Sequence, residues 1–249
     1  RASLGKDGVG FDRGAELSRV HRLPWILRAE LAQIPRNIPY GREIRLPASI
    51  GVELVWYARE RLKGLAYIQR PLREIARALV NGATKKSEAL VLGQIGGFAV
   101  PIDDLDSNGR AAMGTLVADG WARESRHAGG EDVVMPTVPE LFMAELCDVV
   151  SRELEARIDD PAAAARWLSD TCAGLFLGDV IGAQAIIDCG LRLGSFPQLL
   201  IVKLLEDRPE VRTMGAALIA MTLRDGSLMH LKIGEDGSIT PSDRSGNAI

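Results

Sequence analysis

Residues 141–158, LFMAELCDVVSRELEARI, carry the clearest structural pattern in the chain. The charged residues near its end fall mostly on one side of a helix, and the apolar residues recur at the three- and four-residue spacing of the other side: Leu146, Val149, Val150 and Leu154. The stretch therefore predicts a long helix that packs an apolar face against a core.

Two further helices are predicted downstream of this stretch. Asp160 is suited to cap a helix whose first residue is Pro161 and which runs to about Leu177. Residues 180–187 are almost entirely apolar, which predicts a buried helix. Near the carboxyl terminus, Asp-Gly pairs at 225–226 and 236–237 separate strand-like runs and predict a small antiparallel meander: Ala216–Leu223, Leu228–Ile233 and Ser238–Thr240.

Upstream, the apolar spacing predicts helices over 16–34, with a break or a fresh start at Pro24, and over 49–64. Another helix is expected over 71–80, where the inner stripe is Leu72, Ile75, Ala76 and Leu79. The fold class is thus mainly α with small antiparallel β elements. We expect a flexible arm over 1–15, a basic helical region over 16–138 and a helical domain with the meander over 139–249.

Charge is divided unevenly along the chain. Residues 1–86 hold 17 basic and 8 acidic side chains, a net charge of +9, whereas residues 87–249 carry a net charge of −12. Such a division indicates either that the basic part meets an external polyanion or that the two parts, or neighbouring copies of the chain, face each other.

The candidate binding residues lie mainly in the predicted helices of the basic third, close to Trp56, Tyr57 and Tyr67. Arginine beside aromatic residues suits phosphates and stacked bases, because its guanidinium group can stack and also donate two parallel hydrogen bonds. The alternative is that these residues form the solvated faces of amphipathic helices. The set is Arg59, Arg61, Lys63, Arg70, Arg73, Arg77, Lys85, Lys86 and, further along, Arg110.

Three elements are predicted in succession: a helix over 110–118, an Asp-Gly-Trp corner at 119–121 and a hairpin over 122–138. With an earlier helix over 88–97, this segment resembles a winged-helix module, which implies a recognition helix and a β-ribbon that contact DNA or a protein. The segment departs from a DNA-binding module in its charge. Arg110 is the only basic residue of the would-be recognition helix, and the ribbon balances Arg123 and Arg126 with carboxylates.

No catalytic motif or cofactor fingerprint is found. The Asp104-x-Asp106-x-Asn108-Gly109 run matches only the first half of a calcium loop, and it also suits a helix cap, so no metal site is predicted. The three cysteines, Cys147, Cys172 and Cys189, lie in apolar stretches, which favours buried thiols in a reduced, cytoplasmic environment. No membrane segment is expected.

The sequence therefore favours a non-catalytic binding or assembly protein whose basic third engages nucleic acid or an acidic protein surface. The first alternative is a structural subunit of an oligomer or larger complex held by basic-to-acidic contacts. The second is an enzyme of unrecognised type.

Overall fold

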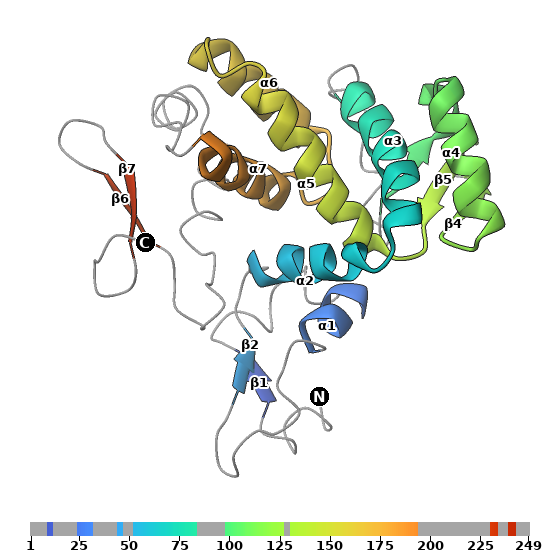
Figure 1. Cartoon of the computed structure of the whole chain (residues 1–249), viewed down its shortest axis with the longest axis horizontal. Helices are drawn as coiled ribbons and strands as arrows, with labels where there is room; N and C mark the ends of the chain where they lie inside the picture. Colours follow the sequence, from blue (N-terminus) through green and yellow to red (C-terminus); the bar gives the residue numbers. More distant parts are fainter. Residues whose placement is uncertain are drawn as a thin grey trace.

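The computed structural model describes residues 9–11, 24–31, 44–46, 52–83, 98–126, 130–193, 230–233 and 239–242. Most of these residues are helical (Figure 1). The helices are α1 (Pro24–Leu31), α2 (Val52–Lys63), α3 (Ala66–Ala83), α4 (Ser107–Ala118), α5 (Pro139–Glu155), α6 (Pro161–Ala173) and α7 (Gly178–Leu193). The strands are β1 (Val9–Phe11), β2 (Ile44–Leu46), β3 (Val100–Pro101), β4 (Ala122–Arg126), β5 (Asp132–Pro136), β6 (His230–Ile233) and β7 (Ile239–Ser242), and η4 (Ile102–Asp104) is a 3-10 turn.

Helix α5 lies at the centre of the helical body and packs against α2, α3 and α7 (Figure 1). Its apolar face, predicted from the spacing of residues 141–158, is buried. The first turns of the helix are buried on every side, so that Glu140 and Glu145 are buried as well. A helix enclosed in this way cannot leave its polar side chains in water, and they must find partners in its neighbours.

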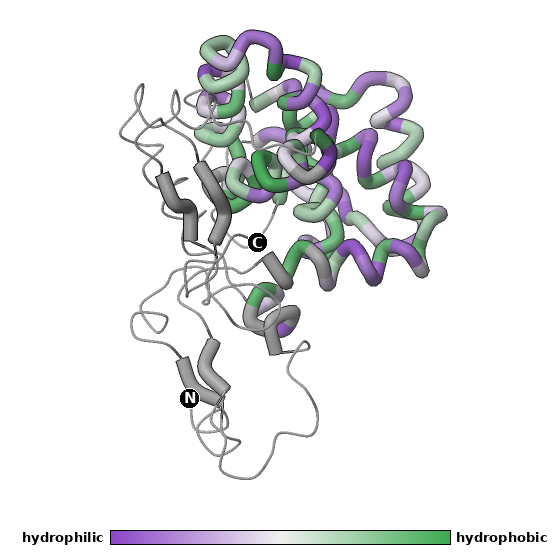
Figure 2. Tube along the Cα trace, turned by 60° about the vertical axis from the view of Figure 1, so that its left-hand side comes forward, coloured by the Kyte–Doolittle hydropathy of each residue, from purple (hydrophilic) through white to green (hydrophobic). Residues whose placement is uncertain are grey.

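The buried apolar residues form one cluster from Trp25 in α1 to Cys189 in α7. Phe98, which precedes β3, is at its aromatic centre: its ring centroid lies 5.3 Å from that of Phe142 in α5 and 5.4 Å from that of Phe176, just before α7. Figure 2 shows hydrophobic and hydrophilic positions alternating along the helices of this body, as expected of helices with one buried face. The cluster joins both sides of the predicted boundary at 138, and the division into domains stays a prediction.

Several predicted helices are confirmed, and the residues at which two of them begin are explained by the sequence. Helix α1 begins at Pro24, the predicted fresh start. Helix α6 begins after Asp160, whose Oδ1 accepts hydrogen bonds from the N–H groups of Ala162 and Ala163 at 3.1 and 3.0 Å. Residues 180–187 form part of the buried helix α7.

Helix α3 extends beyond the predicted 71–80 at both ends, and Pro71 lies inside it. Because Pro71 is the sixth residue of α3, it lies beyond the first turn, and its missing N–H removes the intrahelical hydrogen bond to the carbonyl oxygen of Tyr67. The predicted inner stripe of α3 is buried: Leu72, Ile75, Ala76 and Leu79.

The β structure consists of small sheets. Strands β3, β5 and β4 form an antiparallel sheet in that order. The β4–β5 hairpin follows α4 in the chain, and its strand β5 pairs with β3, which precedes α4. Strands β6 and β7 pair antiparallel, with Ile233 opposite Ile239. The first of the three runs predicted for the meander, 216–223, lies outside the described residues. The predicted helix over 88–97 also lies outside them.

Strand β1 pairs in parallel with β2. The sequence predicted no strand within the arm over 1–15, and the rest of that arm lies outside the described residues. No helix within the described part of the chain has both the length and the apolar content needed to cross a membrane.

Close packing between α3 and α6 depends on Gly174. A methyl group at this position would lie 2.9 Å from the carbonyl oxygen of Ala83 at the end of α3. We expect Gly174→Ala to lower the free energy of unfolding by about 1–3 kcal/mol, because the two backbones must separate. The matched control is Gly114→Ala in α4, where a methyl group meets no atom within 4 Å, and it should raise stability by about 0.5–1 kcal/mol. Urea denaturation measures both values, and equal effects would contradict this packing.

Candidate partner-binding surface

The arginines of α2 and α3 divide into those that turn inward and those that face solvent. Helices α2 and α3 both pack on α5, and α5 and α7 present buried carboxylates toward them. Arg59, Arg61 and Arg73 each pair with one of these carboxylates. Part of the predicted binding set therefore contributes to the fold itself.

Arg73 in α3 bridges two acidic residues of α5. Its Nε donates to Glu145 Oε2 at 2.9 Å, and its Nη2 lies 3.4 Å from Asp148 Oδ2. Gln69, one turn earlier, donates from Nε2 to the other oxygen of Glu145 at 2.9 Å. Both oxygens of this buried carboxylate thus have a donor, as a charge in this environment requires.

Arg59 in α2 pairs with Asp188 in α7, which lies 129 positions away in the sequence. Its Nη1 donates to Asp188 Oδ1 at 3.0 Å and its Nη2 pairs with Oδ2, an arrangement in which both nitrogens of the guanidinium fork are used. Gln184 also donates to Asp188 Oδ1, at 2.9 Å. The side chain of Asp188 is 6% exposed and that of Arg59 is 30% exposed, so the pair joins α2 to α7 with the carboxylate buried and the guanidinium group partly in contact with water.

Arg61 pairs with Glu140 in the first turn of α5. Its Nη1 donates to Glu140 Oε1 at 2.8 Å, and its guanidinium carbon lies 5.8 Å from the centre of the Tyr57 ring. Oε2 of Glu140 is buried and has no hydrogen-bond partner within the described part of the chain. The negative charge of Glu140 also lies at the positive end of the helix dipole.

Burial shifts the pKa values of this network. It raises the pKa of Glu145 above the ordinary value of 4.5, although the hydrogen bond from Gln69 and the charge of Arg73 act in the opposite direction. Burial alone would lower the pKa of Arg59, but the hydrogen bond and charge of Asp188 outweigh it, and the pKa is raised. Arg59 therefore keeps its charge in the folded protein.

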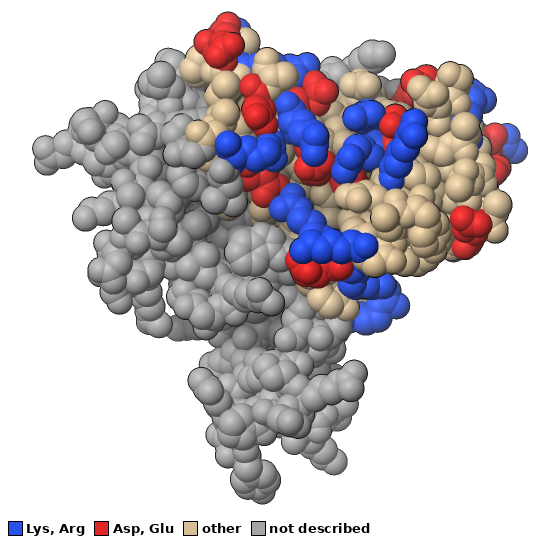
Figure 3. Space-filling view, in the orientation of Figure 1, with Lys and Arg blue, Asp and Glu red and all other residues tan. Residues whose placement is uncertain are grey.

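The other candidate residues do not join these inward pairs. Lys63 pairs with Glu60 and Arg77 with Glu74, each within its own helix, while Arg110 is exposed and donates from Nε to the carbonyl oxygen of Leu105 at 3.2 Å. Arg70 is exposed and makes no ion pair with any described residue. Lys85 and Lys86 lie outside the described residues. Figure 3 shows basic side chains interspersed with acidic ones across this face.

Beside Arg70 lies a pair of aromatic rings. Tyr67 in the first turn of α3 is 59% exposed, and its ring meets that of half-buried Trp121 with centroids 6.4 Å apart and planes at 69°. Arg70 is three residues after Tyr67 and so lies on the same side of α3. We call Tyr67, Arg70 and Trp121 together the aromatic patch.

The end of α4 holds Trp121 in place. Gly120 adopts a left-handed backbone conformation with a φ of 77°, its N–H bonds to the carbonyl of Val117, and the N–H of Trp121 bonds to that of Leu116 at 2.8 Å. This is a Schellman cap, which ends the helix and fixes the direction of the following residue. Thr137 adds two hydrogen bonds, to the carbonyl oxygens of Gly120 and Trp121.

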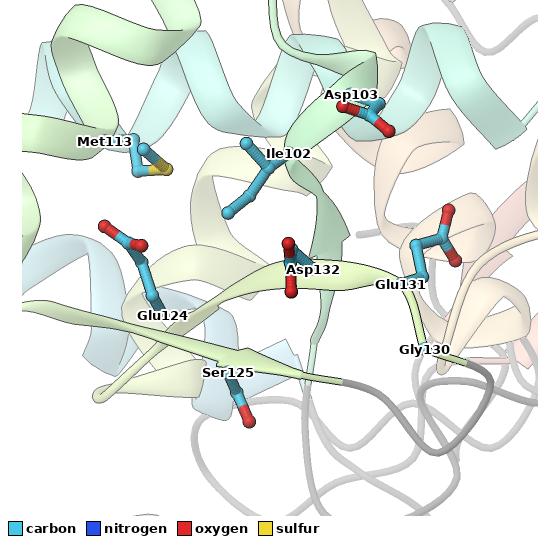
Figure 4. Close-up of a pocket in the computed structure, with 8 residues that line it drawn as sticks. All are labelled: Ile102, Asp103, Met113, Glu124, Ser125, Gly130, Glu131 and Asp132. Carbon is cyan, nitrogen blue, oxygen red and sulfur yellow. The ribbon is translucent and has the colours of Figure 1, made fainter.

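On the hairpin, a pocket of about 590 Å³ lies between β4, β5 and the α4 side of the sheet (Figure 4). Glu124 points toward Met113 of α4 in this view, and Ser125 points away. The lining is acidic and contains no basic residue: Ile102, Asp103, Met113, Glu124, Ser125, Gly130, Glu131 and Asp132. This region repels phosphate groups.

The half-match to a calcium loop is explained by helix capping. Asp106 Oδ1 accepts a hydrogen bond from the N–H of Gly109 at 2.7 Å and caps α4. Among the described residues, no group of three or more His, Cys, Asp or Glu side chains is placed to hold a metal ion. The three cysteines are buried free thiols, and burial raises the pKa of Cys147 and of Cys189. The thiols of Cys147 and Cys189 are therefore protonated at neutral pH, which makes them poor nucleophiles.

The acidic partners of the arginines, Glu140, Glu145 and Asp188, were not predicted from the sequence. A signal was available for Glu145, because a single charge among Leu141, Phe142 and Leu146 indicates a carboxylate that enters a core. No local pattern indicates the pairing of Asp188 with Arg59, since 129 positions separate them.

No known protein family, curated protein or solved structure matches this chain. The functional inference therefore depends on the chemistry of the side chains.

Removing one partner of the Arg59–Asp188 pair should be costly. We expect Arg59→Met to lower the free energy of unfolding by about 3–5 kcal/mol, because Asp188 would remain buried without its cation. The double variant Arg59→Met/Asp188→Leu should recover most of that loss. Lys63→Met, which removes an exposed cation, should cost no more than about 1 kcal/mol. Urea denaturation tests these values, and equal losses for Arg59→Met and Lys63→Met would contradict the role of the buried pair.

The raised pKa of Glu145 predicts a specific pH dependence. The folded chain binds this proton more readily than the unfolded chain, so the contribution of Glu145 to stability is fully present below pH 4.5 and is lost as the pH rises through the folded pKa. Glu145→Gln lacks this contribution. As the pH is lowered from neutral toward 4.5, the free energy of unfolding of the parent protein should therefore rise relative to that of Glu145→Gln. Urea denaturation across this range measures the difference, and one that is constant with pH would refute the prediction.

Proposed function

We propose that this chain is a non-catalytic binding or assembly protein that engages an acidic protein surface through the solvent side of α3. The observation that carries the proposal is the division of the α3 arginines. Arg73 is committed to α5, whereas Arg70 is exposed without an ion pair among the described residues, and Arg77 is half-exposed beside Glu74. The outward side of α3 thus retains positive charge that the fold does not use.

The charge of the helical body favours a protein partner over nucleic acid. The described residues between 52 and 193 hold 20 acidic and 13 basic side chains, and the hairpin pocket is acidic. A nucleic acid carries a charge on every nucleotide and requires a broad basic surface. An acidic protein segment needs only a local positive area with neutral side chains around it.

DNA binding through a winged-helix-like module is the second candidate. Helix α4, the corner at Trp121 and the β4–β5 hairpin follow one another, and β3 completes the sheet in the order β3-β5-β4. That sequence of elements favours the resemblance, with α4 as the recognition helix. The charges disfavour DNA as its ligand, since Arg110 is the sole cation of α4.

The oligomer and enzyme alternatives have less support. Basic-to-acidic contacts occur here within a single chain, so a second copy is not needed to neutralise the inward arginines. The described groups with shifted pKa values are Glu145, Cys147, Cys189 and Arg59, and they take part in core packing or in the ion pairs between helices.

Binding of labelled polyanions tests the proposal. Fluorescein-labelled poly-glutamate should bind in a salt-dependent manner, and Arg70→Glu/Arg77→Glu should weaken binding by about tenfold or more, because the charge of the α3 surface is reversed. Arg166→Glu, at an exposed position on α6, is the matched control and should leave binding nearly unchanged. Fluorescence anisotropy at low and physiological salt measures both.

Two results would contradict the proposal. One is poly-glutamate binding that Arg166→Glu and the α3 variant weaken equally. The other is a labelled DNA duplex that binds more tightly than poly-glutamate and loses its affinity in Arg110→Glu, which would favour the winged-helix candidate.

A further inference from the structure

We infer that the aromatic patch, Tyr67, Arg70 and Trp121, recognises an acidic protein segment that carries an aromatic or branched apolar side chain next to its carboxylates. This inference rests on the proposed function and specifies the ligand of the α3 surface. It follows from the geometry of the two rings, the rigidity of their supports and the position of Arg70.

The rings of Tyr67 and Trp121 meet edge to face, and the Tyr67 ring is exposed to solvent. An edge-to-face pair with planes at 69° leaves a ring face uncovered, and Tyr67 is the most exposed large apolar side chain among the described residues, with Leu193 at 41% the other one. Covering such a ring with an apolar side chain removes apolar surface from water from both molecules. Burial of this exposed ring therefore favours binding of an apolar group, whereas the charge of Arg70 alone would favour only a carboxylate.

The supports of the patch are fixed before a ligand arrives. Trp121 is held by the Schellman cap of α4 and by the hydrogen bonds of Thr137. Tyr67 stands in the first turn of α3, and the next residue, Ile68, is fully buried. A preformed site loses little conformational entropy on binding. Tyrosine, tryptophan and arginine, the residue types of this patch, are also those that contribute most to binding at protein interfaces.

The charges around the patch select the kind of segment. Arg70 lies one turn from Tyr67, so a carboxylate next to the inserted apolar side chain would meet the guanidinium group. Further along the same side of α3, Glu74 neutralises Arg77, and exposed Asp119 precedes the Trp121 corner. On this side of α3 the cation without an ion pair among the described residues is thus Arg70, and Arg123, two residues after Trp121, is a second exposed cation beside the patch. Stacked bases also suit aromatic rings, but the phosphates of a continuous strand would meet these carboxylates.

A pair of matched peptides tests the inference on the full chain. Both are glutamate-rich and labelled with fluorescein; one carries a single central phenylalanine, and the other carries serine there. We expect the phenylalanine peptide to bind about tenfold more tightly, and Tyr67→Ala to abolish that difference. Leu193→Ala, which truncates the other exposed apolar side chain, is the control and should preserve it. Thermal unfolding checks that the variants fold.

The outcomes separate this inference from the proposed function. If both peptides bind equally and Arg70→Glu weakens both, the proposed function stands and the aromatic preference is wrong. If neither peptide binds, both are wrong. If a labelled single-stranded DNA binds more tightly than either peptide and loses affinity in Tyr67→Ala, the occupant is nucleic acid and the inference is overturned.

Discussion

The fold depends on carboxylates that are buried along its central helix and its last described helix. Glu140 and Glu145 in α5 and Asp188 in α7 are almost fully enclosed. A buried carboxylate is tolerated only when a cation or several donors accompany it. Arg61, Arg73 and Arg59 supply those cations from α2 and α3. The packing of the first part of the chain on the second is therefore fixed by charge as well as by apolar contact.

This constraint changes how the uneven charge of the sequence is understood. Three of the nine residues predicted to bind a polyanion or partner, Arg59, Arg61 and Arg73, form ion pairs between helices of the molecule. The proposed partner-binding area is accordingly confined to the outer side of α3, with Arg70 next to the rings of Tyr67 and Trp121. Tyrosine, tryptophan and arginine side chains of this kind are typical of protein recognition, whereas a long basic groove is typical of nucleic-acid binding.

The sequence predicts the elements much better than their partners. Apolar spacing and caps suffice for α5, α6 and α7, because Asp160 and the apolar run over 180–187 act locally. Arg73 and Arg77 are one turn apart on α3, yet Arg73 pairs with α5 and Arg77 stays exposed. That difference is set by α5, a helix more than fifty residues away in the chain. Long-range pairs of this kind leave no periodic pattern in the sequence.

A double-mutant cycle between Arg73 and Glu145 tests most directly whether these pairs hold the fold together. The free energy of unfolding is measured for the parent, Arg73→Leu, Glu145→Leu and the double variant, by urea denaturation at neutral pH. A favourable coupling energy of about 1.5–3 kcal/mol is predicted, because each single variant leaves a charge without its main partner. A coupling energy indistinguishable from zero would contradict the account, since α3 and α5 would then be held together by apolar contact alone.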